Sequence, residues 1–328
     1  MRRDLIQFNN ISPDKELLLT KLVLSYKSKS NEAFSHRRWI VQRSMKLINN
    51  SAHDMEHVLG RELQISQFAA ERAKNNYHAW NHRIWLMENF LKDLGCSLLL
   101  CELEFSFTWI SRNVSDHSGY HYRQRILSYI REYRAPLSYF FKYDNYVTNL
   151  LNISSSESIL SNLLGYYPTE SQKDAYEAYL CVLLHEATTV LTELNENFPG
   201  HESLWYHRRF VVHSLLTIVY EYLGVKKKYV VNFNHIKIGN DSNIMNVDVV
   251  SSVDTRIESS GVKSPKIFKP ELTTSESCAL YKMLIKLESE FVSSEYSKHF
   301  NEVQLELVRR HEKWLKCVLC LDYFYDLS

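Results

Sequence analysis

Apolar residues recur at helical spacing through most of the chain. Four of them lie at i, i+4, i+7 and i+11 along one helix face: Trp80, Ile84, Met87 and Leu91. Similar stripes predict further helices at residues 17–24, 62–74, 98–112 and 175–196. With only 8 glycines and 6 prolines in 328 residues, few positions can break a helix. The pattern therefore predicts an all-α protein of long helices joined by short loops.

The predicted helices come in pairs. Each first helix is followed by a short polar stretch that contains Asn, Asp or Gly, at residues 30–31, 75–76, 115–119 and 199–201. Such stretches are typical of turns, and a second helix begins directly after each one. The first pair opens with Ser12 and Pro13, which suit the N-cap and the first position of a helix. The units are therefore helical hairpins.

A short motif marks the second helix of four hairpins. It reads aromatic, any residue, His or Tyr, Arg, any residue and usually a second aromatic, at residues 34–39, 80–85, 120–125 and 205–210. Successive motifs start 46, 40 and 85 residues apart. A period of about 40 residues is typical of repeats with two helices each. The last interval spans two periods, so residues 134–172, with a weak helix at 137–151, are expected to hold a degenerate or interrupted unit.

The positions of the apolar residues also predict how the hairpins stack. Trp80 and Trp85 lie on neighbouring faces of one helix, so this hairpin is apolar on two sides and Trp85 can reach the adjacent repeat. Stacked neighbours bury those sides, which predicts a right-handed alpha-alpha superhelix, a curved solenoid, in one domain of residues 1–328. Residues 225–275 lose the helical pattern and become polar, so a disordered or loop insertion is expected there. Helices at 276–291 and 300–324 are expected to close the chain.

Composition narrows the class of protein. The formal net charge is +1, from 39 basic and 38 acidic residues, which provides no overall attraction to nucleic acid. The six cysteines are scattered through apolar helical stretches, which favours a reducing compartment. Cys317 and Cys320 have a metal-like spacing, but no second pair completes a site. Neither a signal-peptide run nor a bilayer-length apolar stretch occurs, so we expect a soluble, cytoplasmic protein that binds no metal itself.

The His and Arg of the motif invite a catalytic interpretation. They recur once per repeat, however, at His36, His82 and His207 and at Arg37, Arg83, Arg123 and Arg208. A residue that occurs in every repeat is typical of a structural role rather than of a catalytic site. We expect each Arg to bridge to a carboxylate or a backbone carbonyl of the neighbouring hairpin, and each imidazole to bond a buried backbone group. No P-loop, dinucleotide loop, nucleophile elbow or HExxH segment occurs, so independent catalysis is not expected.

Four motifs at near-regular spacing carry a family resemblance. Residues 76–85 read Asn-Tyr-His-Ala-Trp-Asn-His-Arg-Ile-Trp, which resembles the unit Asn-Tyr-x-x-Trp-x-His-Arg-x-Trp of the protein prenyltransferase alpha subunit family. Residues 114–124 and 199–209 resemble a divergent branch, the prenyltransferase alpha-subunit-repeat-containing proteins. The resemblance covers roughly residues 13–220. It implies a crescent of helical hairpins wrapped around a second chain, the beta subunit.

The resemblance also implies an activity. In such enzymes the beta subunit holds the isoprenoid diphosphate, the protein substrate and a catalytic zinc, which activates the substrate cysteine as a thiolate. This chain would then bind no cofactor and would shape one wall of the cleft. The branch implies a heterodimer with the beta subunit of a Rab-type geranylgeranyltransferase. Its co-substrate would be geranylgeranyl diphosphate, and its protein substrates an already prenylated SNARE and an F-box protein.

A lysine near the start of a repeat is the first candidate site residue that the resemblance implies. Related enzymes place a lysine five residues before the motif aromatic, where its charge neutralises the departing diphosphate. Lys29 lies five residues before Phe34, and Lys74, the alternative, lies six before Trp80. The resemblance therefore implies Lys29, or alternatively Lys74, as the diphosphate-binding residue.

The next unit of the family contributes Asn-Tyr-His beside the substrate cleft. Asn76, Tyr77 and His78 match these residues. The match implies Tyr77 and His78 as catalytic-site residues with Lys29, and Asn76 as a residue of the substrate cleft. The alternative is structural, because the same three residues can cap and pack the hairpin.

Two functions remain open at this stage. The first is an alpha-like regulatory or structural subunit of a heterodimeric protein geranylgeranyltransferase. The second is a non-catalytic helical-repeat scaffold that binds proteins. The second is favoured by Tyr122 in place of the motif His, by Arg125 in place of the motif Trp, and by Ser30 and Asn31 in place of Asn-Tyr after Lys29. Isoprenoid length depends on the depth of the pocket in the beta subunit, so the sequence of this chain does not determine it.

Overall fold

The computed structural model describes residues 12–45, 52–153, 159–164, 170–222, 278–298 and 302–318, and every regular element among them is a helix. The repeat helices before the insertion are α2 (Pro13–Tyr26), α3 (Asn31–Met45), α4 (Ala52–Arg72), α5 (Tyr77–Leu94), α6 (Cys96–Arg112) and α7 (His117–Glu132). Those after it are α10 (Glu170–His185), the π-helical turn η2 (Glu186–Val190), α11 (Leu191–Asn197), α12 (Glu202–Tyr222), α13 (Ala279–Ser297) and α14 (Glu302–Val318). The predicted insertion at 225–275 lies outside the described residues.

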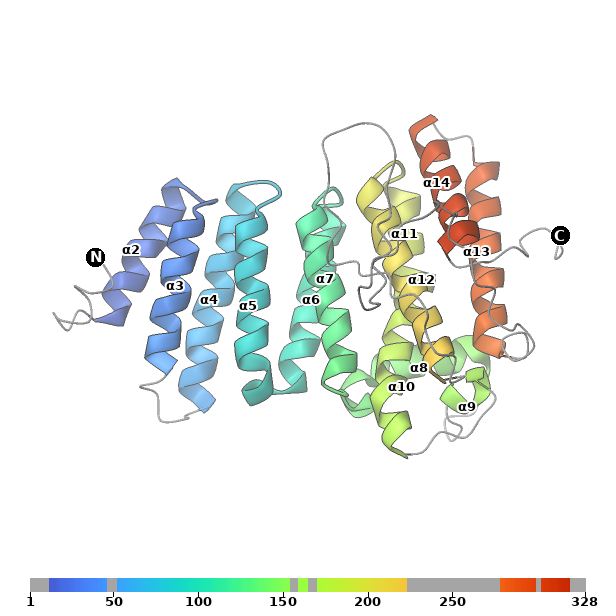
Figure 1. Ribbon diagram of the computed structural model, residues 1–328, viewed down its shortest axis with the longest axis horizontal. Helices are drawn as coiled ribbons and strands as arrows, with labels where there is room; N and C mark the ends of the chain where they lie inside the picture. The colour runs from blue at the N-terminus through green and yellow to red at the C-terminus, as the bar shows by residue number, and fades with distance from the viewer. Residues whose placement is uncertain are drawn as a thin grey trace, which may run out of the picture.

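The helices form a row of antiparallel hairpins (Figure 1). The pairs α2–α3, α4–α5 and α6–α7 each pack internally, and each second helix also packs on the second helix of the next pair. The fourth hairpin has α10, η2 and α11 as one long first arm and α12 as its second arm. The all-α solenoid predicted from the sequence is therefore confirmed.

A fifth hairpin, α13–α14, continues the row. Helix α12 packs on both α13 and α14, so the chain from residue 278 onward lies at the end of the array (Figure 1). The sequence pattern predicted two closing helices here, and the structure stacks them as a further repeat unit.

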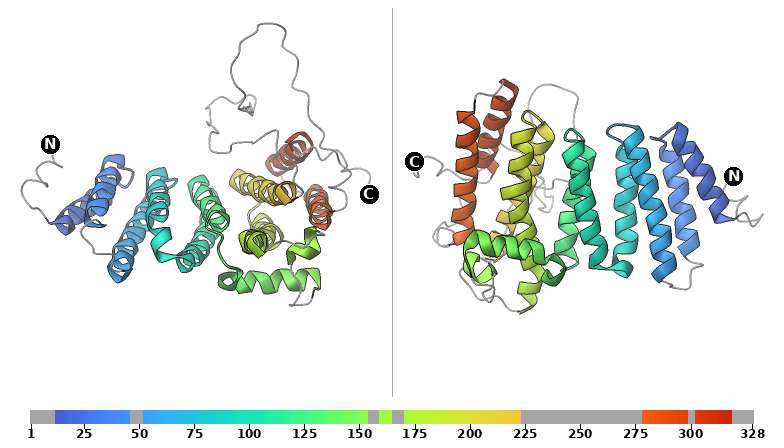
Figure 2. Two further views of the ribbon diagram at one scale, coloured as in Figure 1. Left: turned by 60° about the horizontal axis from the view of Figure 1, so that its bottom comes forward. Right: turned by 180° about the vertical axis from the view of Figure 1, so that it is seen from behind.

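Residues 134–172 were expected to hold a degenerate repeat, and the structure corrects this expectation. The 3-10 turn η1 (Leu137–Phe140), α8 (Phe141–Leu151) and α9 (Ile159–Leu164) leave the row, and α8 crosses its lower end (Figures 1 and 2). Helix α8 packs on α10, α9 packs on α10 and α13, and α7 packs directly on α10 and α12. The segment is therefore an insertion between adjacent repeats, and no repeat unit is missing from the row.

The motif aromatics divide into two structural roles. Trp80 and Trp205 are 3% and 2% exposed and lie in the core. Trp39 and Trp85 are half-buried and stack on the rings of His36 and His82 at centroid distances of 5.7 and 5.6 Å. Arg38 of the preceding hairpin approaches the Trp85 ring to 5.9 Å. The predicted packing of the aromatics within and between repeats is therefore confirmed.

The loops inside the hairpins lie along one edge of the array, at the top of Figure 1. We call this edge, formed by residues 27–30, 73–76, 113–116 and 198–201, the loop edge. Asp116 Oδ2 accepts hydrogen bonds from the indole N–H groups of Trp80 (3.0 Å) and Trp109 (2.9 Å), which ties the second hairpin to the third. Gly119 is required beside them, because a Cβ there would lie 2.8 Å from Trp109 Cδ1. None of the described helices is both long and apolar enough to cross a membrane.

Candidate functional site

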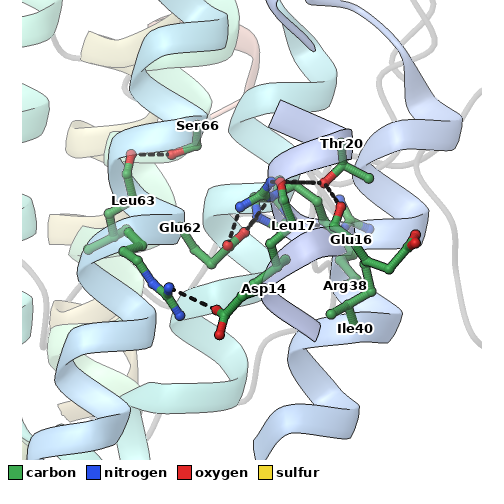
Figure 3. A network of polar contacts seen from close by, with 12 residues as sticks. Asp14, Glu16, Leu17, Thr20, Arg38, Ile40, Glu62, Leu63 and Ser66 are labelled. Carbon is green, nitrogen blue, oxygen red and sulfur yellow. Dashed lines mark hydrogen bonds and ion pairs between the residues drawn. The ribbon is translucent and has the colours of Figure 1, made fainter. Parts of the chain in front are cut away.

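A buried polar cluster joins each hairpin to the next. In the first junction, Arg37 of α3 donates from Nε to Glu62 Oε2 of α4 at 2.8 Å and from Nη2 to Oε1. His82 Nε2 of α5 lies 3.0 Å from Glu62 Oε2. All three side chains are at most 3% exposed. Figure 3 shows Glu62 pointing into this junction toward Leu17 and Thr20 of α2.

The same cluster recurs at each later junction. Its members are Arg83, Glu102 and Tyr122, then Arg123, Glu186 and His207, then Arg208, Glu288 and His311. In these three clusters the Arg Nε and Nη2 atoms lie 2.6–3.1 Å from the carboxylate oxygens, a bidentate geometry that suits the planar guanidinium. We call the series the interhairpin ladder. The predicted bridging role of the motif Arg is confirmed.

The remaining guanidinium nitrogen binds the Arg's own hairpin. Arg123 Nη1 donates to the carbonyl oxygen of Leu103 at 2.8 Å and to Ser106 Oγ at 2.9 Å. Arg37 and Arg83 make the same pair of bonds, with Leu17 and Thr20 and with Leu63 and Ser66. Arg37, Arg83 and Arg123 therefore each link their own first helix to the Glu of the next hairpin, whereas Arg208 Nη1 is buried without such a bond.

The motif histidines were expected to bond backbone groups, and this expectation was wrong. His82 and His207 are fully buried and bond the ladder carboxylates through Nε2. Arg38 Nε lies 3.4 Å from His82 Nδ1, so the second ring nitrogen faces a donor. An acceptor Nδ1 and a donor Nε2 describe a neutral imidazole. Burial lowers the pKa of both histidines and outweighs the opposing effect of the carboxylates.

Tyr122 replaces the motif histidine without breaking the ladder. Its hydroxyl donates to Glu102 Oε2, the same carboxylate that Arg83 contacts. Burial and the nearby Glu102 carboxylate raise the pKa of Tyr122 well above its ordinary value, so it remains a donor. Tyr122 therefore keeps the bond to the carboxylate that His makes in the other clusters.

The fifth hairpin carries an incomplete form of the motif. Arg309 replaces the leading aromatic residue, and Glu312 replaces the Arg. His311 bonds Glu288 at 2.7 Å and stacks on Trp314, as His82 does with Trp85. Glu312, however, follows the His where an Arg follows it elsewhere, so the ladder ends here. A Glu about 20 residues before each His was the signal that could have identified this unit.

The ladder predicts a decline in stability on acidification. Burial lowers the folded-state pKa of His82, His207 and His311 below the ordinary 6.5, so these histidines favour folding above pH 6.5 and oppose it as the pH falls below that value. Despite burial, which acts in the opposite direction, bonds from His82 and Arg37 lower the pKa of Glu62 to about 2, so its contribution is lost between pH 4.5 and about 2. Urea unfolding should show a stability that is unchanged from pH about 7.5 to 6.5 and then falls, toward pH about 5, by up to about 1.4 kcal/mol per pH unit for each such histidine. A flat profile over that range would contradict neutral buried histidines.

The structure brings the first lysine candidate together with the Asn-Tyr-His segment. Lys29 is exposed in the α2–α3 loop. Asn76, fully buried, donates from Nδ2 to the carbonyl oxygens of Ser28 (2.8 Å) and Ala69 (2.9 Å). Its Oδ1 accepts from Ala79 N and caps α5. Asn76 therefore holds the loop next to Lys29 against the start of α5.

Tyr77 and His78 lie at the start of α5, directly after that cap. Tyr77 is 59% exposed and its ring meets the His78 ring edge-on at 5.8 Å. Glu32, near the start of α3, carries a lowered pKa, chiefly because its backbone N–H and Ser30 bond the carboxylate, with smaller effects of Lys27 and His78. Lys29, Tyr77 and Glu32 are therefore exposed at this junction, and His78 is partly exposed.

Lys74 lies in a different junction. It is exposed in the α4–α5 loop and lines a groove between α4 and α6, together with Arg112 and Asn113. The two lysine candidates thus face different neighbours along the loop edge. Among the described residues no group of three or more His, Cys, Asp or Glu side chains is placed to hold a metal ion.

The comparisons with known proteins agree with the repeat structure. The family model for the protein prenyltransferase alpha subunit repeat matches residues 13–44, 59–90, 99–130 and 184–215, which correspond to the first four hairpins. The chain is 33% identical over 224 residues to protein prenyltransferase alpha subunit repeat-containing protein 1 of Danio rerio, covering 64% of this chain and 49% of that protein. It is 31% identical over 237 residues to the protein of the same name from Homo sapiens, covering 64% and 53%.

A more distant similarity reaches a transferase subunit. The chain is 27% identical over 115 residues to geranylgeranyl transferase type-2 subunit alpha of Saccharomyces cerevisiae, covering 35% of this chain and 33% of that protein. The chain spans about half the length of the curated repeat-containing relatives it matches.

Proposed function

Because the chain belongs to the family of proteins built from protein prenyltransferase alpha subunit repeats, we propose that it is the alpha-type subunit of a cytoplasmic, two-chain protein geranylgeranyltransferase. Its partner would be a Rab-type beta subunit, which supplies the zinc and binds geranylgeranyl diphosphate. The observation that carries the proposal is the continuous ladder of alpha-type hairpins. In this ladder the repeated Arg and His side chains are buried and bonded to Glu residues between the hairpins. Lys29, Tyr77 and His78 are not part of the ladder and are accessible at one junction.

The chain's own contribution to the reaction would be electrostatic. When the cysteine thiolate attacks the first carbon of the isoprenoid, negative charge grows on the departing diphosphate, and a nearby cation stabilises it. Lys29 can supply that charge, because it is exposed in a loop that the Asn76 bond to Ser28 holds against α5. Tyr77 can offer a hydroxyl donor beside it. An already prenylated SNARE and an F-box protein are the proposed protein substrates.

Co-expression with a Rab-type beta subunit tests the proposal. We expect the two chains to co-purify and to transfer labelled geranylgeranyl to a cysteine-ending substrate, whereas neither chain does so alone. The beta subunit with its usual alpha subunit is the positive control. Failure both to co-purify and to support transfer would contradict the proposal.

A non-catalytic scaffold is the second candidate. It is favoured by the same ladder, because none of the buried Arg, Glu and His groups can reach a substrate. It is also favoured by Ser30, whose hydroxyl accepts a hydrogen bond from Ala33 N and donates to Glu32, so this loop is organised around its own cap. Co-purification with a beta subunit without any transfer would select this function.

A further inference from the structure

The junction between the fourth and fifth hairpins lacks hydrogen bonds that earlier junctions have. At the first junction Arg38 Nε lies 3.4 Å from His82 Nδ1, and at the second the Trp80 indole donates to Asp116 at 3.0 Å. At the last junction the equivalent atoms are buried and have no hydrogen-bond partner among the described residues: Trp205 Nε1, Arg209 Nε and His311 Nδ1. Buried polar atoms are therefore left unsatisfied where α12 meets α13 and α14.

The unbonded Nη1 of Arg208 belongs to the same junction and has a cause in the sequence. In the first three hairpins the motif Arg donates to a hydroxyl four residues after a Glu of its own first helix, at Thr20, Ser66 and Ser106. Val190 is four residues after Glu186, and the intervening turn is π-helical, which holds one extra residue and brings Leu191 to the same level. Both side chains are apolar and buried, so neither offers an acceptor to Arg208.

Arg209 is a buried cation without a counter-charge. The four ladder arginines each contact a carboxylate. Arg209 is 5% exposed, and none of the described carboxylates lies within ion-pair distance of it. Its guanidinium carbon lies 5.6 Å from the Tyr206 ring and 6.0 Å from the Trp314 ring. Burial lowers the pKa of Arg209, which reflects the unfavourable free energy of keeping this charge between α12 and α14.

Other bonds hold the fifth hairpin on the fourth. Glu288 of α13 accepts from Arg208 Nε and Nη2 at 3.1 and 2.8 Å and lies 2.7 Å from His311 Nε2. Gln304 of α14 accepts from Gly200 N at 2.6 Å. When a junction opens, water satisfies its unbonded donors and acceptors, so the unbonded atoms favour the open state. The closed state is therefore stabilised less here than at the first junction, where the equivalent atoms are bonded.

We propose that α13–α14 is a detachable unit, which separates from α12 as a whole while the first four hairpins remain folded. Each hairpin of a repeat protein contacts chiefly its neighbours, so an end hairpin can open without disturbing the others. Opening would uncover Trp205, Arg208 and Arg209, which contact Phe291, Glu288 and Trp314 in the closed state. The array would then have two states with different surfaces at this end, and a partner that binds one of them would shift their ratio.

Hydrogen exchange of the full chain, followed by mass spectrometry of its peptides, tests the proposal. The first hairpin, α2–α3, is the matched control, because it also lies at an end of the array (Figure 1). Peptides from α13 and α14 should exchange at least about 10-fold faster, relative to their intrinsic rates, than peptides from α2 and α3. Equal rates at the two ends, or faster exchange in α2–α3, would overturn the proposal.

A pair of matched substitutions tests the physical cause. Arg209→Met removes the unpaired cation and keeps an apolar contact with the aromatic rings, so exchange in α13 and α14 should slow about 5-fold or more. Arg38→Met, at the equivalent position of the first junction, removes the bond to His82 and should instead accelerate exchange in α2 and α3. Unchanged or faster exchange of α13 and α14 in the Arg209→Met variant would contradict the proposal.

Cysteine labelling gives an independent readout. Cys278, at the N-cap of α13, and Cys181, in α10, are 2% and 0% exposed. Opening exposes Cys278 but not Cys181, so a thiol reagent should modify Cys278 first, and Arg209→Met should slow that reaction. Modification of both thiols at one rate would indicate global unfolding and would rule out a detachable unit. None of these measurements involves prenyl transfer, so their outcomes are separate from failure of the proposed enzymatic role.

Discussion

Replacing Glu186 with glutamine is expected to lower the free energy of unfolding by about 3–5 kcal/mol, because it leaves a buried guanidinium without its counter-charge. Arg123 donates to both oxygens of Glu186 at 2.6 Å, and His207 lies 2.7 Å from the same carboxylate. All three residues are at most 2% exposed. Burial alone would lower the pKa of Arg123 and Glu186 raises it, so removing the carboxylate leaves the buried guanidinium with only the unfavourable effect of burial.

Urea unfolding followed by far-UV circular dichroism measures this loss. Glu104→Gln is the matched control, because Glu104 pairs with Lys142 at 2.5 Å on the surface, where an ion pair contributes about 0–1 kcal/mol. The double variant Arg123→Met/Glu186→Met should recover part of the loss, since it removes both charges together. A Glu186→Gln variant as stable as the Glu104→Gln control would show that this junction does not depend on the ladder.

The second large effect is expected on transfer rather than on stability. In a heterodimer with a Rab-type beta subunit, Lys29→Ala should lower kcat on the order of 10-fold to 100-fold, because a cation near the departing diphosphate is lost. Co-purification with the beta subunit should not change, since Lys29 is an exposed loop residue outside the ladder. Lys29→Arg should recover part of the rate by restoring the charge.

Two further variants locate the effect. Lys92→Ala removes another exposed lysine, on α5, and should leave kcat unchanged. Asn76→Ala removes the hydrogen bond to Ser28 and should reproduce part of the Lys29 effect, because the loop is no longer held against α5. If Lys29→Ala turned over at the native rate while Lys74→Ala was slow, the diphosphate contact would belong to the α4–α6 groove.

The hydrophobic pattern sufficed to predict hairpins, their period and their stacking. It succeeded because each hairpin is a local unit, whose apolar stripe and polar turn lie within about 40 residues of one another. The structural role of the motif Arg could also be predicted. A residue that recurs in every repeat is expected to stabilise the contact between neighbouring hairpins, which every repeat has in common. The aromatic residues followed the same logic, and Trp80 and Trp205 are indeed buried.

The Glu partners of the repeated Arg residues could not be predicted from a fixed spacing, unlike the Glu that lies about 20 residues before each motif His. Arg37 and Glu62 are separated by 25 residues, whereas Arg123 and Glu186 are separated by 63, although the two pairs have the same geometry. A variable insertion between repeats hides such a pair from any fixed spacing. The interval of 85 residues was therefore interpreted as a degenerate repeat, when α8 and α9 in fact leave the row between two adjacent hairpins.

Repeat identity and hairpin architecture follow from the chain alone, because helix periodicity and turn chemistry are short-range properties of neighbouring residues. Packing between hairpins decided the rest. It set Glu62 and Glu186 as the partners of the motif His and Arg, placed Lys29 beside Asn76, and put Lys74 in a separate groove. These contacts join residues from different hairpins. Their geometry depends on how the hairpins pack against one another, which no short stretch of sequence determines.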